Sequence, residues 1–234
     1  MDKIIVDKIL SQRNPEKAKL LSRYFKTGKG QYAEGDIFLG LTNPEVRTIP
    51  KAYAKLTTLR DVEKLLQSEF HEVRLCGLLI LVEKYRKSDE SGKREIFDFY
   101  LSNTKGINNW DLVDVTCHKV VGEYLLHHPK EREILYTLAK SNNIWERRIS
   151  IISTFAFIRQ GQLNDSIDIS SILLHDKEDL IHKAVGWALR EVYKKNKDVT
   201  KKFIEENIST MPRVMLRYAI EKMPEDERKG YLNK

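Results

Sequence analysis

Asp114 stands out as a side chain that could do chemistry, because it breaks the pattern of the helix on which it is predicted to lie. The apolar face of a helix over residues 109–126 is formed by Trp110, Val113, Cys117, Val121 and Tyr124. Asp114 falls inside this stripe, one turn after Trp110. An unpaired buried carboxylate would cost several kcal/mol or take up a proton. Asp114 therefore needs a cation, hydrogen-bond donors or a function, and a buried ion pair or a cap on a neighbouring helix are the structural alternatives. The nearby Asp111 is less informative, because acids are common in a first turn.

Arg148 breaks its pattern in the same way. Trp145, Ile149, Ile152 and Phe155 define the inner side of a helix over residues 144–159. Arg148 falls among them, whereas Arg147 is predicted to point outward. A buried arginine must be paired. Its partner could be Asp114, a DNA phosphate, or an acid in a structural salt bridge between adjacent repeats.

Trp187 lies outside the apolar stripe of a helix over residues 179–195, roughly 130° away from it at 100° per residue. The stripe is formed by Ile181, Ala184, Val185, Ala188, Leu189 and Val192. The helical neighbours of Trp187 include Lys183, Arg190 and Lys194. A tryptophan packed against an adjacent repeat is one interpretation. The basic surroundings favour another, because aromatic rings among cations engage nucleic acids.

The elements that must position these side chains are helices, since apolar residues recur at spacings of three and four almost everywhere. The predicted helices cover residues 2–11, 14–26, 43–54, 58–67, 70–87, 91–103, 109–126, 131–140, 144–159, 165–174, 179–195, 198–207, 212–222 and 225–232. Asn14 and Asn43 are predicted N-caps, and Asn108 with Asp111 resembles a capping box. The stretch 27–40 is glycine-containing and is predicted to be an irregular loop.

The helices also show a weak repeat. Arg74, Arg148, Lys183 and Arg213 lie near the starts of similar amphipathic helices, separated by 74, 35 and 30 residues. Two-helix units of roughly 37–47 residues are typical of HEAT and armadillo solenoids, which stack helix pairs into a curved body. We therefore expect an all-α solenoid of about six HEAT-like repeats with a basic concave face, as one domain over residues 1–234. A plain helical bundle is the alternative.

Composition agrees with a helical protein and excludes several other classes. The 234 residues include 41 Lys and Arg against 34 Asp and Glu, a net charge of +7, with 11 Gly and 6 Pro. No apolar run approaches the ~18–20 residues needed to span a bilayer. The two cysteines, Cys76 and Cys117, indicate a reducing, cytoplasmic compartment. We expect no metal and no cofactor, because the six histidines lack metal-ligand spacing and no nucleotide-binding fingerprint occurs.

Three runs resemble those of the AlkD-like DNA alkylation repair glycosylases. They are Asn109-Trp110-Asp111-Leu112-Val113-Asp114, Asn142-Asn143-Ile144-Trp145-Glu146-Arg147-Arg148 and Lys183-Ala184-Val185-Gly186-Trp187-Ala188-Leu189-Arg190-Glu191. Asn14-Pro15-Glu16-Lys17 and Leu39-Gly40-Leu41-Thr42-Asn43-Pro44 are also similar, so the resemblance extends in order over essentially the whole chain. Some relatives carry a second Trp where this chain has Asn109, a change expected to have little effect.

The resemblance implies HEAT-like repeats wrapped around duplex DNA and hydrolysis of the N-glycosidic bond of cationic alkylated purines, chiefly 3-methyladenine and 7-methylguanine, without drawing the base into a pocket. It implies that Asp114 is the catalytic carboxylate, that Trp110 and Trp187 contact the lesion, and that Arg148 is the active-site arginine. Arg148 would fix a backbone phosphate or keep Asp114 ionised. The residues expected to contact DNA are Arg147, Lys183, Arg190, Lys194, Arg213, Arg217, Thr42, Asn43 and Arg47.

Two other functions remain open from the residues themselves. A HEAT-repeat scaffold that binds DNA or senses lesions would bind through a basic face and release no base. A protein–protein adaptor would show no salt-dependent DNA affinity and would leave Trp187 and Asp114 unexplained. For the glycosylase interpretation the expected partner is duplex DNA with alkylated purines. The protein is expected to act as a monomer in the cytoplasm, or at the nucleoid of a bacterium.

Overall fold

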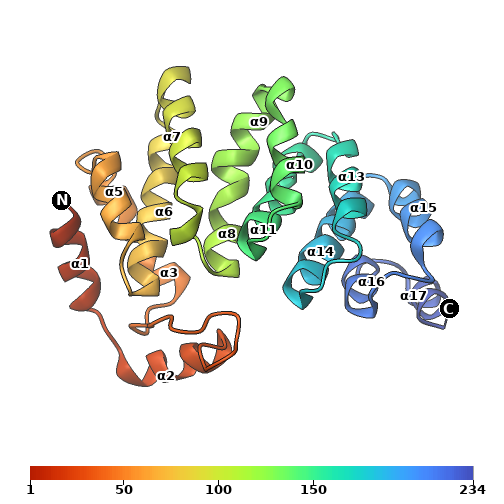
Figure 1. Ribbon diagram of the computed structural model, residues 1–234, viewed down its shortest axis with the longest axis horizontal. Helices are drawn as coiled ribbons and strands as arrows, with labels where there is room; N and C mark the ends of the chain where they lie inside the picture. Colours follow the sequence, from red (N-terminus) through yellow and green to blue (C-terminus); the bar gives the residue numbers. More distant parts are fainter. Residues whose placement is uncertain (234) are drawn as a thin grey trace. The chain divides into compact units, whose positions relative to one another are not determined.

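The computed structural model describes residues 1–233, and within that range the fold is all-helical, as predicted (Figure 1). No strand forms among these residues; an isolated bridge joins Ile37 and Phe70. The chain divides into two compact units, residues 1–116 and 117–234. The first contains α1 (Asp2–Leu10), α2 (Pro15–Tyr24), α3 (Asn43–Val46), α4 (Pro50–Tyr53), α5 (Leu59–Leu66), α6 (His71–Tyr85), α7 (Glu90–Ser102), η1 (Thr104–Gly106) and most of α8 (Trp110–Cys117).

Helix α6 forms the centre of the first unit. It packs against α1, α3, α4, α5 and α7, and Figure 1 shows α5, α6 and α7 following one another. Its run from Leu78 to Val82 is buried throughout, because neighbouring helices cover it on several sides. This burial accounts for an apolar sequence that lacks the clear one-sided pattern of a surface helix.

Side-chain caps set several helix starts. The Oδ1 atom of Asn14 accepts a hydrogen bond from the backbone N–H of Lys17, as predicted for this position. Thr58 and Asp61 form a reciprocal capping box at the start of α5. Such bonds satisfy backbone N–H groups that the first helical turn leaves unpaired.

The second unit is built around α14. It contains η2 (His118–Gly122), α9 (Glu123–His127), η3 (Pro129–Glu131), α10 (Glu133–Ala139), α11 (Ile144–Ser153), α12 (Phe155–Arg159), α13 (Asn164–Ile172), α14 (Asp179–Lys195), α15 (Lys197–Asn207), α16 (Arg213–Ala219) and α17 (Glu225–Leu232). Helix α14 packs against α11, α13, α15 and α16. At Gly186 a Cβ atom would lie 2.5 Å from both the Met215 carbonyl oxygen and the Tyr218 Cβ, so glycine permits the close approach of α16.

Two predicted helices are each divided in the structure. The stretch 43–54 forms α3 and α4, and Pro50, which lacks a backbone N–H, begins the second of these. The stretch 144–159 is interrupted at Thr154, whose hydroxyl donates to the Ile151 carbonyl at 2.7 Å. By contrast, residues 110–127 are helical throughout, with π-type turns at 118–122.

The solenoid prediction is confirmed at the level of its secondary structure. Arg74 and Arg148 lie near the starts of α6 and α11, and Lys183 and Arg213 lie near the starts of α14 and α16, in line with the predicted spacing. The number of repeats, the curvature, the basic concave face and the single domain over 1–234 stay predictions. Among the helices of residues 1–233, none has the length and apolarity required to cross a bilayer.

Candidate active site

The N-terminus of α8 positions two of the residues expected to act on a substrate. The side chain of Asn109, which is fully buried, caps the helix by accepting the Trp110 N–H at 2.8 Å. Asp111 likewise accepts the Leu112 N–H at 2.9 Å. The predicted capping box of Asn108 with Asp111 is therefore wrong, because Asn109 provides the cap and the Asp111 carboxylate binds Leu112 and His71 instead.

The indole of Trp110 is half-buried and is held by aromatic neighbours from the first unit. It stacks on Phe25 with ring centroids 5.0 Å apart and an angle of 12°, and Tyr24 meets it edge-on at 6.0 Å. Its Nε1–H donates to the hydroxyl of Tyr32 at 3.2 Å. Residues from α2 and from the irregular segment before α3 therefore fix the ring while leaving part of it accessible.

Asp114 lies one turn beyond Trp110, on the same side of α8. Its side chain is half-buried, so the prediction of a fully buried carboxylate is corrected. A single helical turn thus presents an aromatic ring and a carboxylate together, both partly open to solvent.

A buried cluster of charged side chains lies beneath this turn. His71 Nδ1 is 3.0 Å from Asp36 Oδ2, and His71 Nε2 is 3.0 Å from Asp111 Oδ2. Arg74 pairs with the other carboxylate oxygen of Asp36, and the Nδ2 atom of Asn109 donates to Asp36 Oδ2 at 3.1 Å. The His71, Asp36 and Asp111 side chains are each only 2% exposed.

The cluster shifts the pKa values of its members. Burial alone would lower the pKa of His71, but the charge and hydrogen bond of Asp111, with those of Asp36, raise it to about 9. Burial would raise the pKa of Asp36, but the hydrogen bond from His71 and the charge of Arg74 hold it below its usual value.

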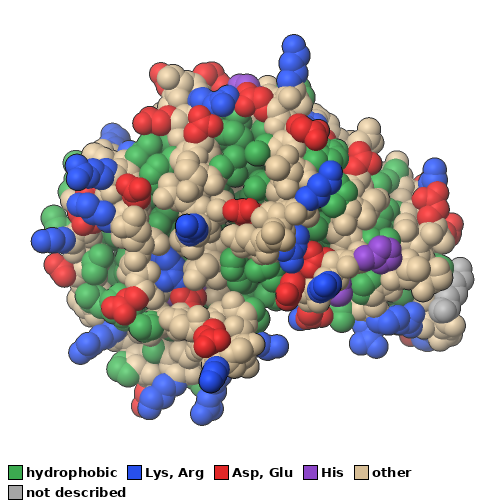
Figure 2. Space-filling view, in the orientation of Figure 1, with side chains coloured by type: hydrophobic (Ala, Val, Ile, Leu, Met, Phe, Trp, Pro, Cys, Tyr) green, Lys and Arg blue, Asp and Glu red, His purple; other side chains and the backbone are tan. Residues whose placement is uncertain are grey.

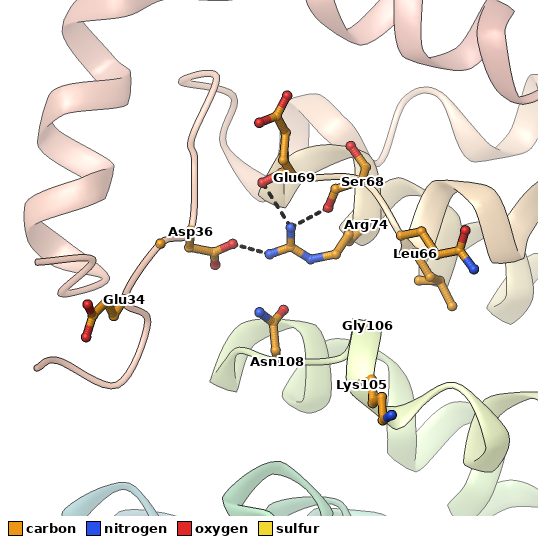
Figure 3. Close-up of a pocket in the computed structure, with 11 residues that line it drawn as sticks. Glu34, Asp36, Leu66, Ser68, Glu69, Arg74, Lys105, Gly106 and Asn108 are labelled. Atoms are coloured by element: carbon orange, nitrogen blue, oxygen red, sulfur yellow. Dashed lines mark hydrogen bonds and ion pairs between the residues drawn. The ribbon is translucent and has the colours of Figure 1, made fainter. Parts of the chain in front are cut away.

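Figure 3 shows the side of the cluster that opens to solvent. Arg74 reaches the Asp36 carboxylate and the backbone carbonyls of Ser68 and Glu69, at 2.8 and 3.1 Å for the two carbonyls. These groups and Asn108 line an open hollow of about 420 Å³. Sequence reasoning missed the cluster, although a histidine at the start of a buried helix and the acid Asp111 were its visible signals.

The segment before α3 is anchored by the residue that follows His71. The buried Glu72 carboxylate accepts backbone N–H bonds from Leu39, Gly40 and Leu41 at 2.8–3.1 Å. Gly40 has a φ of +94°, and a Cβ there would lie 2.1 Å from the Asn14 carbonyl oxygen. Only glycine fits this close approach, which explains the Leu39-Gly40-Leu41 run in physical terms.

Arg148 and Arg147 are both held within the second unit. Arg148 is 5% exposed, as its place in the apolar stripe predicted, and its Nη1 donates to the Leu180 carbonyl. Arg147 was predicted to point outward. That prediction is wrong, because its side chain is 15% exposed and binds both carboxylate oxygens of Asp176, at 2.6 and 3.3 Å.

Trp187 lies on α14 outside the apolar stripe, as predicted, and the stripe itself is fully buried. The ring is half-buried and meets Phe155 edge-on at 4.8 Å. Its Nε1–H donates to Glu191 at 3.2 Å, and Glu191 also binds Lys194 at 2.7 Å. The predicted basic surroundings therefore contain an acid that sequence reasoning did not weigh.

The other residues expected to contact DNA are mostly exposed and several are already ion-paired. Lys183 pairs with Asp179 at 2.7 Å, and Arg190 pairs with Glu221. Arg47, Arg213 and Arg217 are exposed, and the face seen in Figure 2 carries Lys and Arg interspersed with Asp and Glu.

Thr42 and Asn43 lie at the start of α3. Thr42, rather than the predicted Asn43, is the N-cap, and its N–H and hydroxyl both donate to Glu45 at 2.7 and 2.8 Å. These bonds and Lys17 lower the pKa of Glu45 to about 2. Within the described residues, no group of three or more His, Cys, Asp or Glu side chains is arranged to hold a metal.

Comparison with known proteins now decides the family. The family model described as DNA alkylation repair enzyme matches residues 5–223, nearly the whole chain. The chain belongs to the DNA alkylation repair enzyme family. No curated protein matches it significantly.

Two solved structures share the fold of this family member. One is described as a predicted DNA alkylation repair enzyme from Enterococcus faecalis, with a TM-score of 0.73 and 19% identity over 92% of this chain and 98% of that one. The other is AlkD2 from Streptococcus mutans, with a TM-score of 0.57 and 19% identity over 90% of this chain and 99% of that one. At this identity the likeness concerns the fold alone.

Proposed function

We propose that this member of the DNA alkylation repair enzyme family is a monofunctional DNA glycosylase. It hydrolyses the N-glycosidic bond of cationic alkylated purines, such as 3-methyladenine and 7-methylguanine, in duplex DNA. The observation that carries the proposal is the start of α8, where the half-buried Trp110 and Asp114, one turn apart, share one side of the helix. Family membership over residues 5–223 supports a role in repair of alkylated DNA.

The chemistry requires only one carboxylate. An alkylated purine with a formal positive charge is already a good leaving group, so no general acid has to protonate it. As the glycosidic bond lengthens, positive charge develops on the deoxyribose. Asp114, ionised and adjacent, would stabilise that charge and orient a water molecule for attack on the sugar carbon. Glycoside hydrolases, whose leaving groups are poorer, use two carboxylates instead.

The two tryptophans would hold the lesion nucleotide without a deep pocket. Each ring is half-buried and anchored through its Nε1–H, Trp110 by Tyr32 and Trp187 by Glu191. Aromatic faces contribute a cation–π interaction with the developing positive charge on the sugar. The Arg148 guanidinium, anchored on the Leu180 carbonyl, would bind a backbone phosphate.

The flanking phosphates would be bound by the cations and by the start of α3. The residues proposed for this role are Arg147, Lys183, Arg190, Lys194, Arg213, Arg217, Thr42, Asn43 and Arg47. Lys183, Arg190 and Lys194 exchange their carboxylate partners for phosphates on binding, so affinity falls steeply with salt. The protein would bind DNA as a monomer, and its partner would be the chromosomal DNA of its cell.

Base release tests the proposal directly. Duplexes of one sequence carry a single 7-methylguanine, a single 3-methyladenine or an unmodified purine. Wild-type protein is expected to release the cationic base, leaving an abasic site, and to leave the neutral purine intact. Asp98→Asn, which alters an exposed ion pair on α7, serves as the matched control and should retain the wild-type rate. Tight, salt-dependent binding without release of either cationic base would instead identify a non-catalytic DNA-binding scaffold.

A further inference from the structure

His71 makes two charged hydrogen bonds in opposite directions. One ring nitrogen faces Asp36 on the segment before α3, and the other faces Asp111 in the first turn of α8, each at 3.0 Å. An ionised carboxylate has no proton to donate, so it can only accept hydrogen bonds. Both ring nitrogens must then carry a proton, because a neutral imidazole would leave one nitrogen lone pair facing a carboxylate oxygen. The geometry therefore describes an imidazolium that joins two acidic side chains.

The charges of the cluster balance. Asp36 and Asp111 contribute two negative charges, and His71 and Arg74 contribute two positive charges. Each of these side chains is at most 5% exposed. Removing one member leaves a buried charge without its partner, which is far more costly than replacing a balanced set.

The cluster connects to the start of α8 through the two residues that flank Trp110. Asp111 binds His71, while Asn109 binds Asp36 through its Nδ2 and caps Trp110 through its Oδ1. The His71 ring also stacks on Phe38 at 4.3 Å and lies 5.3 Å from Phe25, the ring on which Trp110 stacks. His71 thus contacts, directly or through one further residue, the groups on both sides of Trp110 and the ring on which Trp110 stacks.

We propose that His71 is a positioning residue for base excision, acting through Asp36 and Asp111 to fix the turn of α8 that carries Trp110 and Asp114. This inference rests on the proposed function. His71 does not touch the substrate. It holds the residues that do, and displacements near 1 Å at a reacting group can reduce a rate by about 10²-fold.

The principal test separates positioning from general stability. His71→Gln cannot donate to both carboxylates, so the first turn of α8 loses one of its two anchors. At a temperature where circular dichroism shows the variant folded, its single-turnover release of 7-methylguanine should fall about tenfold or more. Its DNA affinity should stay within about threefold of wild type, because the phosphate contacts are unchanged.

Leu78→Ala provides the matched control. Leu78 is a fully buried apolar residue two turns further along α6, and its truncation lowers stability by creating a cavity. Folded Leu78→Ala protein should release base at the wild-type rate. Asp111→Asn, isosteric with the wild-type side chain, is the second test variant; measured where circular dichroism shows it folded, it should also slow release without weakening binding. Release by both cluster variants at the wild-type rate would overturn the proposal.

A spectroscopic readout tests the positioning even if the wild-type protein releases no base. The indole N–H signal of Trp110, assigned by comparison with Trp110→Phe, reports its hydrogen bond to Tyr32. That signal should shift and exchange faster with solvent in His71→Gln and stay at its wild-type position in Leu78→Ala. An unchanged Trp110 signal in His71→Gln would contradict the inference, whereas absent base release with a shifted signal would contradict only the proposed function.

Discussion

The Trp110 indole N–H and the Tyr32 hydroxyl oxygen are joined by a hydrogen bond of 3.2 Å. Tyr32 belongs to the irregular segment before α3, and Trp110 is the first residue of α8. A segment without regular structure therefore contributes directly to the orientation of a ring proposed to contact the lesion. Loops commonly supply functional residues while helices provide the rigid support.

Tyr32→Phe should reduce base release by several-fold while leaving the fold intact. The substitution removes one hydrogen bond worth about 1 kcal/mol and frees the indole to rotate. Single-turnover release of 7-methylguanine and thermal unfolding would be measured together. Tyr53→Phe on α4 is the matched control, expected to behave as wild type. A Tyr32→Phe rate equal to that of the control would show that this bond does not orient Trp110.

Stability should depend on pH through His71. Its pKa is about 9 in the folded protein against an ordinary 6.5, so the proton favours the folded state. This contribution, about 3 kcal/mol at most, is complete below pH 6.5 and is lost as the pH rises through 9. Urea unfolding of wild type at pH 6.5, 8 and 9.5 should show the decline. His71→Gln should be less stable at pH 6.5 and should show a flatter profile; an equally steep profile would assign the decline to other groups.

The contact of α14 with α16 should make Gly186 intolerant of a side chain. A Cβ there would lie 2.5 Å from a backbone oxygen of α16, so Gly186→Ala must push the helices apart. The expected loss is about 1–3 kcal/mol in the free energy of unfolding. Gly230→Ala, on α17 with open space around it, should instead stabilise by up to about 1 kcal/mol. Similar values for the two variants in chemical denaturation would contradict the packing argument.

DNA affinity should depend on exposed cations in an additive manner. Arg47→Gln and Arg217→Gln each remove one proposed phosphate contact and should reduce the slope of log affinity against log salt by about 1. The control is Arg86→Gln, which alters an exposed arginine at the end of α6 that has no proposed role in DNA binding. Fluorescence anisotropy over a salt series provides the measurement. Equal slopes for all three variants and wild type would remove Arg47 and Arg217 from the interface.

Local patterns predicted much of the fold correctly. The stripe from Ile181 to Val192 gave α14 its bounds and its buried face, and it left Trp187 outside, as the structure confirms. Asn14 and Pro15 likewise marked the start of α2, because capping depends only on residues that are neighbours in the sequence. The division of residues 43–54 and 144–159 depended on single backbone positions, Pro50 and Thr154, which periodicity does not weigh.

Contacts between distant segments could not be predicted in this way. Asp111 looked like an ordinary first-turn acid, yet it pairs with His71, 40 residues earlier. Arg147 looked exposed because its partner Asp176 follows it by 29 residues. Side-chain pairing across the fold, rather than helical pattern, decided these cases.

The effect of Asp114→Asn on base release, measured with DNA binding, tests the central claim most directly. A duplex with one 7-methylguanine is incubated with excess wild-type, Asp114→Asn or Asp98→Asn protein, and free base is quantified over time. We expect release by wild type and Asp98→Asn, a rate at least about 10²-fold lower for Asp114→Asn, and similar affinities for all three. Release by Asp114→Asn at the wild-type rate would contradict the assignment of Asp114 as the catalytic carboxylate.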